Sequence, residues 1–160
     1  MSEKKPIRVF VTHAFNESDD YLRVFEFLES VDRFFYLNVS KPENLPAEGG
    51  AEAIKDELIT QIKEAEAFVV IADALEAQGD LVRYMMDVAE ANDIGMMSIH
   101  PFGGVVDTPQ DVVARVTDDL EWNARTIVDT ITLLARGQET ARWEVVDFPG
   151  FNEDGEIEES

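Results

Sequence analysis

Three polar side chains with acid–base chemistry each follow a short apolar run, where a ligand site is expected if the runs are strands. They are His13, Asp73 and His100. Imidazole and carboxylate groups exchange protons and stabilise positive charge. The chain has only two histidines and no cysteine, which excludes thiol nucleophiles, iron–sulfur clusters and Cys-based zinc sites. With no further histidine to support them, His13 and His100 do not predict a metal site.

Common phosphate-binding motifs are absent from the sequence. No glycine-rich loop of the Walker or dinucleotide type follows an apolar run, and residues 12–16 lack the glycine of a flavodoxin phosphate loop, which argues against FMN. A phospho-receiver needs an acidic pair, an acceptor Asp and a Lys, and only Asp73 fits that pattern. The pairs Asp19-Asp20 and Asp118-Asp119 are interpreted as helix-end and surface charges.

The elements that must position these residues alternate between β-type runs and amphipathic helices. Strands are expected at 7–12, 34–39, 68–71, 94–99 and 119–122, with helices near 18–31, 54–65, 81–89, 111–116 and 123–136. This order predicts an α/β fold, a single doubly wound, flavodoxin-like parallel sheet of five strands with helices on both faces. Ligands bind beyond the carboxyl ends of such strands, so the site is expected in the loops that follow them.

The composition describes an acidic domain. In 160 residues there are 34 Asp and Glu against 13 Lys and Arg, a net charge of −21. Such a charge argues against partners that are nucleic acids or anionic membranes. No apolar run approaches the roughly 18 residues of a membrane span, and no signal peptide is recognised, so a cytoplasmic location is expected. The scarcity of lysine suggests a host with high internal salt.

The C-terminal residues 137–160 differ from the rest. They carry −7 of the charge, which leaves −14 on residues 1–136. We expect residues 1–136 to form the domain and 137–160 an acidic extension whose last nine or so residues are disordered. Its aromatic part, near Trp143 and Phe151, is expected either to pack as an edge segment or to form a contact surface.

Five short segments of the sequence carry a family likeness. They are VFVTHAF (9–15), FVVIA (68–72), YMMDVA (84–89), HPFG (100–103) and EWN (121–123). In order and spacing they resemble the TIR-like family of the Thoeris anti-phage system, over about residues 7–136. The resemblance implies a flavodoxin-like fold and a role in prokaryotic defence signalling. It also implies NAD+ chemistry, because members cleave the nicotinamide–ribose bond and release a cyclic ADP-ribose-type signal that activates an effector.

The resemblance further implies a catalytic position. In the family a Glu on the third helix stabilises the oxocarbenium-like charge, and the register set by Tyr84, Asp87 and Ala89 places Met85 there. Methionine carries no charge, so NAD+ turnover is expected to be lost or reduced. A replacement carboxylate from the loops stays open: Asp73, Glu76 or Asp107.

The nucleotide-binding residues implied by the resemblance surround that position. They are His13, Phe15, Gly49, Gly50, Asp73, Tyr84, Met85, His100, Trp122 and Asn123. Because the chain is so acidic, a pyrophosphate is expected to be held by backbone N–H groups, which Gly49-Gly50 and Gly103-Gly104 can supply. Simpler roles stay open as well, namely core packing for Phe15 and Trp122 and a helix N-cap for Asn123.

Two classes of function therefore follow from the sequence. In the first, the chain converts NAD+ to nicotinamide and a cyclic signal, with NAD+ as substrate and no cofactor or metal. In the second, it is a non-catalytic module of flavodoxin-like fold that senses a nucleotide or acts as a protein–protein adaptor. Self-association through TIR-type contacts is expected in either class.

Overall fold

The sheet has the strand order of a flavodoxin-like, doubly wound fold. The structure is a computed structural model that describes residues 5–103 and 107–137. Within these residues a sheet of five strands runs in the order β2-β1-β3-β4-β5, and every neighbouring pair is parallel. The strands are β1 (Ile7–Val11), β2 (Tyr36–Asn38), β3 (Ala67–Ile71), β4 (Gly95–Ile99) and β5 (Asp118–Leu120). This arrangement confirms the α/β, flavodoxin-like prediction.

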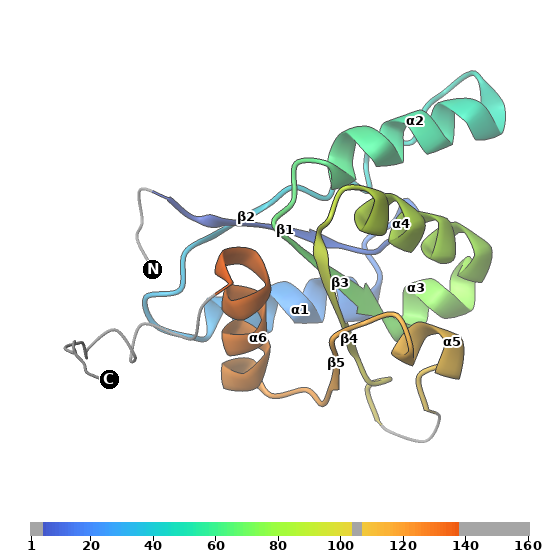
Figure 1. Cartoon of the computed structure of the whole chain (residues 1–160). Coiled ribbons are helices and arrows are strands. Elements are labelled where there is room, and N and C mark those ends of the chain that lie inside the picture. Colours follow the sequence, from blue (N-terminus) through green and yellow to red (C-terminus); the bar gives the residue numbers. More distant parts are fainter. Residues whose placement is uncertain (1–4, 104–106, 138–160) are drawn as a thin grey trace.

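Helices cover both faces of the sheet (Figure 1). They are α1 (Asp19–Glu29), α2 (Gly50–Ile62), α3 (Ala72–Ala77), α4 (Gly79–Ala91), α5 (Gln110–Val113) and α6 (Ala124–Arg136). Helices α1 and α6 contact each other on one face, and α2 and α4 contact each other on the opposite face (Figure 1). The connection after β1 therefore leaves on one face and the connection after β3 on the other. The adjacent strands β1 and β3 thus flank the switch point at which ligands bind in open parallel sheets.

Local sequence signals set the helix ends. Ser18 precedes α1 and its side chain accepts a hydrogen bond from the Tyr21 N–H at 3.3 Å, while Asn123 caps α6 by accepting from the Thr126 N–H at 2.9 Å. Gly137 ends α6 in a left-handed conformation, with φ 63°. All three end signals were expected from the sequence. The two N-caps fix where the helices begin at the carboxyl edge of the sheet.

The core consists of the two inner layers of side chains on the sheet. All five residues of β3 are buried, as expected for a central parallel strand. Met85, Met86 and Met97 are fully buried, so the methionine pairs fill the core rather than present soft ligands. Leu134 of α6 packs over Gly95 so closely that an added Cβ would meet its Cδ2 at 2.9 Å.

Two elements differ from expectation. Strand β2 has three residues instead of six, because it is an edge strand that pairs only with β1 and only over those positions. The sequence predicts no helix between the strand at 68–71 and the helix near 81–89, but α3 lies there. Its sequence ADALEA is rich in helix formers, but it has six residues and is too short to show a period.

The remaining expectations about the chain concern its ends and its relation to membranes. The expected acidic extension, beyond Gly137, lies outside the described residues. In the described part, no helix combines the length and the apolar character needed to cross a membrane.

Candidate functional site

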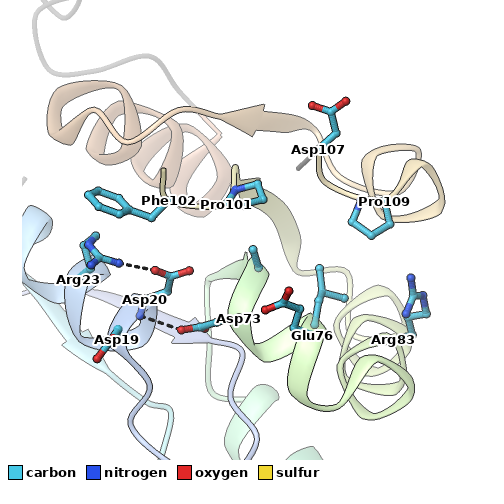
Figure 2. A pocket seen from close by; sticks show the side chains of 12 residues that line it. Asp19, Asp20, Arg23, Asp73, Glu76, Arg83, Pro101, Phe102, Asp107 and Pro109 are labelled. Carbon is cyan, nitrogen blue, oxygen red and sulfur yellow. Dashed lines mark hydrogen bonds and ion pairs between the residues drawn. The ribbon is translucent and has the colours of Figure 1, made fainter. Parts of the chain in front are cut away.

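A cleft of about 520 Å³ opens at the carboxyl edge of the sheet, beside the β1/β3 switch point (Figure 2). Five parts of the chain line it: the start of α1, helix α3, one residue of α4, the segment after β4 and the segment before α5. Its charged side chains are Asp19, Asp20, Arg23, Asp73, Glu76, Arg83 and Asp107. Its position is the one at which doubly wound sheets bind ligands.

Asp73 joins the end of β3 to the start of α1. Its Oδ1 accepts a hydrogen bond from the Ser18 hydroxyl at 2.9 Å, and its Oδ2 accepts from the Asp20 N–H at 3.0 Å. The carboxylate therefore satisfies a backbone donor of the first turn of α1, which has no partner within the helix. Asp73 thus fixes the geometry of the cleft wall as well as contributing charge to it.

Asp20 stands beside Asp73 in an environment that disfavours its charge. Only 6% of the residue is exposed, and its carboxylate pairs with the guanidinium of Arg23 (Figure 2). Burial raises the pKa of Asp20 above its ordinary value, and the nearby charge of Asp73 raises it further, against the opposing effect of Arg23. Carboxyl groups placed in this way are a common starting point for acid–base chemistry.

Aromatic rings and a guanidinium form a platform at one end of the cleft. The Arg23 guanidinium carbon lies 3.7 Å from the Phe102 ring centroid and 5.6 Å from that of Trp122. Trp122 contacts Phe102 edge to face, with centroids 5.9 Å apart, and packs on Phe27 at 5.2 Å. Phe102 is 55% exposed, so one part of its ring surface can accept a planar group of a ligand.

The charge of the cleft lining is negative. Five carboxyl groups face two arginines, and 2 − 5 gives −3 if all are ionised. Both arginines are already paired, Arg23 with Asp20 and Arg83 with Asp111 through contacts of 2.6 and 3.0 Å. The lining therefore favours a neutral or cationic group of a ligand over a bare anion.

Asp73 is the one residue of the ten implied nucleotide contacts that lines this cleft. The three carboxylates that the sequence offered as replacements for the family Glu, namely Asp73, Glu76 and Asp107, all line the cleft (Figure 2). Hence the cleft contains carboxylates, although none comes from position 85.

His13 and Phe15 belong to the loop after β1. The His13 ring is buried, its Nε2 faces the Gln61 Oε1 at 3.1 Å, and its Nδ1 accepts the Phe15 N–H at 3.1 Å. Burial lowers the pKa of His13, so the neutral ring donates from Nε2 to Gln61. The Phe15 ring packs edge-on against His13 at 4.9 Å. Together these contacts connect the loop after β1 to α2.

The implied contacts on α2 and α4 do not line the cleft. Met85 is fully buried in the core, and Tyr84 is partly buried with the Lys55 ammonium 5.2 Å from its ring centroid. Gly49 and Gly50 form the start of α2. Their left-handed backbone angles, φ 97° and 59°, explain why the sequence has glycines there.

The implied contacts near β4 and β5 are held by local bonds. The Trp122 indole N–H donates to the His100 carbonyl at 2.9 Å, and Asn123 is the α6 cap. His100 Nε2 lies 2.9 Å from the Asp119 Oδ2. Trp122 therefore packs against its neighbours and Asn123 caps a helix, which are the simpler roles that the sequence left open.

The sequence did not single out Arg23, Arg83 and Phe102 as site residues. Asp19 and Asp20 do lie in the first turn of α1, as interpreted, but that turn faces the cleft. A usable signal was present, because a helix that begins just after a strand starts at the same sheet edge as the ligand crevice.

Comparison of the sequence with protein-family models and with curated proteins gives no match. Within residues 5–103 and 107–137, no group of three or more His, Asp or Glu side chains is arranged to hold a metal ion.

Proposed function

We propose that this chain is a TIR-like signalling module that binds NAD+ or a related ADP-ribose nucleotide in the cleft without turning it over. The observation that carries the proposal is the cleft at the β1/β3 switch point with the Arg23–Phe102 platform at its end. The resemblance described above supplies the nucleotide class and the setting of prokaryotic anti-phage defence. Self-association and a cytoplasmic location belong to the same proposal.

The electrostatics of the cleft suggest how such a nucleotide would lie. Phe102 offers ring area for stacking, and the guanidinium of Arg23 has donors beyond those that face Asp20. The negative lining suits the cationic nicotinamide ring of NAD+, whereas the pyrophosphate is better placed near Arg23 at the edge.

Absence of turnover follows from position 85. The family carboxylate is replaced by Met85, whose side chain is fully buried and does not line the cleft. Without a carboxylate at the reacting ribose, the developing positive charge lacks its main stabilising group.

A second candidate function is NAD+ hydrolysis by a carboxylate from α3 or from the segment before α5. Asp73, Glu76 and Asp107 line the cleft and are candidates for stabilising an oxocarbenium-like charge. Glu76 and Asp107 are the more informative test positions, because Asp73 also holds the start of α1.

Calorimetric titration with NAD+ and with ADP-ribose, combined with chromatographic detection of nicotinamide, tests both candidates. We expect binding without nicotinamide release, and a Phe102→Ala variant that binds about 3- to 10-fold more weakly because a ring contact is lost. Leu133→Ala is the matched control, since Leu133 is similarly exposed (42%) but lies on α6.

The other outcomes are equally informative. If the wild-type protein releases nicotinamide and Glu76→Gln or Asp107→Asn does not, the proposal of a non-catalytic sensor is rejected in favour of NAD+ hydrolysis. No binding of either nucleotide would reject the nucleotide proposal and favour a protein-only adaptor.

A further inference from the structure

Beside the cleft lies a histidine–carboxylate pair that the proposed function does not use. His100 Nε2 lies 2.9 Å from Asp119 Oδ2. The other carboxylate oxygen, Oδ1, accepts hydrogen bonds from the Ser98 hydroxyl at 2.6 Å and from the Thr108 hydroxyl at 2.9 Å. The Asp119 carboxylate thus has three hydrogen-bonding partners. The imidazole of His100 bonds to Oδ2, and the two hydroxyl groups bond to Oδ1.

The pair adjoins the cleft lining on both sides. Three residues of the cleft lining are Pro101, Asp107 and Pro109. In the sequence, His100 immediately precedes the first of them, and Thr108 lies between the other two. The side chain of His100 is 40% exposed, and that of Asp119 is 18% exposed. The imidazole is therefore partly exposed to solvent next to the cleft lining, while the carboxylate behind it is largely shielded.

The main chain holds the histidine in place. The His100 N–H donates to the Leu120 carbonyl at 2.7 Å, and the His100 carbonyl accepts the Trp122 indole N–H at 2.9 Å. Since an ionised carboxylate only accepts hydrogen bonds, the neutral ring must carry its proton on Nε2 and leave a lone pair on Nδ1. No hydrogen bond to Nδ1 is present within the described residues.

We propose that His100 and Asp119 form an acid–base pair beside the cleft, in which Asp119 is the positioning residue and His100 Nδ1 accepts a proton. The proton comes from a hydroxyl group of the bound ligand or from water. The O–H electron pair stays on oxygen, Nε2 keeps its own proton, and the resulting imidazolium is stabilised by the Asp119 carboxylate. The identity of the ligand, a ribose-bearing nucleotide, rests on the proposed function; the properties of the pair do not.

The hydrogen bond to Asp119 fixes the tautomer of His100 whether or not the ring exchanges protons with a ligand. The tautomer therefore tests the pair itself, and the response to added ligand tests its use. The Asp119→Asn variant changes this hydrogen bond. In that variant the hydroxyls of Ser98 and Thr108 donate to the amide oxygen when it takes the Oδ1 position, and the amide NH2 then faces Nε2. An N–H donor there forces the ring proton onto Nδ1, which abolishes the exposed lone pair.

The test uses the full chain labelled with nitrogen-15 in its two histidines. Wild type is expected to show His100 protonated on Nε2 at neutral pH, and Asp119→Asn is expected to show it protonated on Nδ1. Reaction with diethyl pyrocarbonate, which acylates accessible neutral imidazole, should slow in Asp119→Asn, because the exposed Nδ1 then carries a proton. Buried His13 serves as the internal control that does not react, and Asp118→Asn, an exposed carboxylate one residue away, should match wild type.

Either of two results overturns the pair. One is a wild-type His100 that carries its proton on Nδ1 or exchanges between tautomers, a result that needs no variant to fold. The other is an equal reaction rate in folded Asp119→Asn.

Adding ADP-ribose then separates this inference from the proposed function. A shift of the His100 Nδ1 signal at saturation supports the contact with ligand, whereas binding detected by calorimetry without such a shift removes the pair from the cleft's function. If ADP-ribose does not bind at all, the nucleotide proposal fails and the acid–base pair is still decided by its tautomer and reactivity.

Discussion

Replacing Met85 by Glu places a carboxylate at the position that the proposed resemblance to the TIR-like family implies for a catalytic Glu, and tests where that position lies. In the structure the Met85 side chain is fully buried on α4. Loss of its apolar contacts is expected to lower the free energy of unfolding by about 2–4 kcal/mol in either Met85→Glu or its uncharged control, Met85→Gln. That is a large part of the roughly 5–15 kcal/mol of an ordinary domain.

The charge adds a second loss that depends on pH. A fully buried Glu has its pKa raised by up to several units, and a rise of about three corresponds to about 4 kcal/mol. A raised folded-state pKa means that the folded protein holds its proton longer than the unfolded chain does. The Glu variant should therefore equal the Gln variant below about pH 4 and become progressively less stable than it as the pH rises toward 7.

Urea unfolding of the two variants at a series of pH values measures this difference, and nicotinamide release from NAD+ is assayed in parallel at low temperature. We expect a widening gap in stability and no turnover. A gap that stays within about 0.5 kcal/mol from pH 4 to 7 would mean that residue 85 ionises freely in contact with water. Turnover gained by Met85→Glu would mean that its carboxylate reaches the bound ribose. Either result would refute the placement of this side chain in the core.

Three further predictions concern the cleft, the start of α2 and the surface. Because burial and Asp73 raise the pKa of Asp20, the stability of Asp20→Asn relative to wild type should improve as the pH rises from about 4 to 6; urea midpoints that run parallel over this range would contradict it. Gly49→Ala should be more destabilising than Gly50→Ala in thermal melts, since both have positive φ but only a Cβ at Gly49 would lie 2.7 Å from the Ala53 Cβ; equal losses would count against that contact. Because the net charge is −21, the melting temperature should rise with KCl as self-repulsion is screened, and a flat curve would argue against the high-salt host.

The sheet could be predicted from sequence because each of its signals is local. The continuous apolar run of β3 indicated burial on both faces, and Ser18, Asn123 and Gly137 marked helix ends by capping chemistry that acts over three or four residues. Strand β2 was overestimated for the opposite reason. Its extent depends on how far β1 pairs with it, which is a tertiary property.

The sequence was sufficient to predict where the cleft lies, but not which side chains line it. Strand ends meet at one edge of a parallel sheet, so the loops were the correct region. Which side chains meet there depends on contacts across long separations: Asp73 bonds to residues 53 and 55 positions earlier, and Arg23 stacks on Phe102. His13 also follows a strand, but its side chain is buried and bonds to Gln61 instead of lining the cleft.

The rotation of α4 decides the question of position 85. Arg83 lines the cleft, and each helical residue turns the next by about 100°, so Met85 points about 200° away from Arg83. A helix that presents Arg83 to the cleft must therefore direct residue 85 toward the sheet, where Met85 is indeed buried. The burial of Val82, Met86 and Ala89 on the same face of α4 fixes this rotation, and Arg83 pairs with Asp111 of α5. It follows that, among the described residues, the carboxylates that can act on a ligand in this cleft come from α1, α3 and the segment before α5, and that a Glu at position 85 on α4 would not reach it.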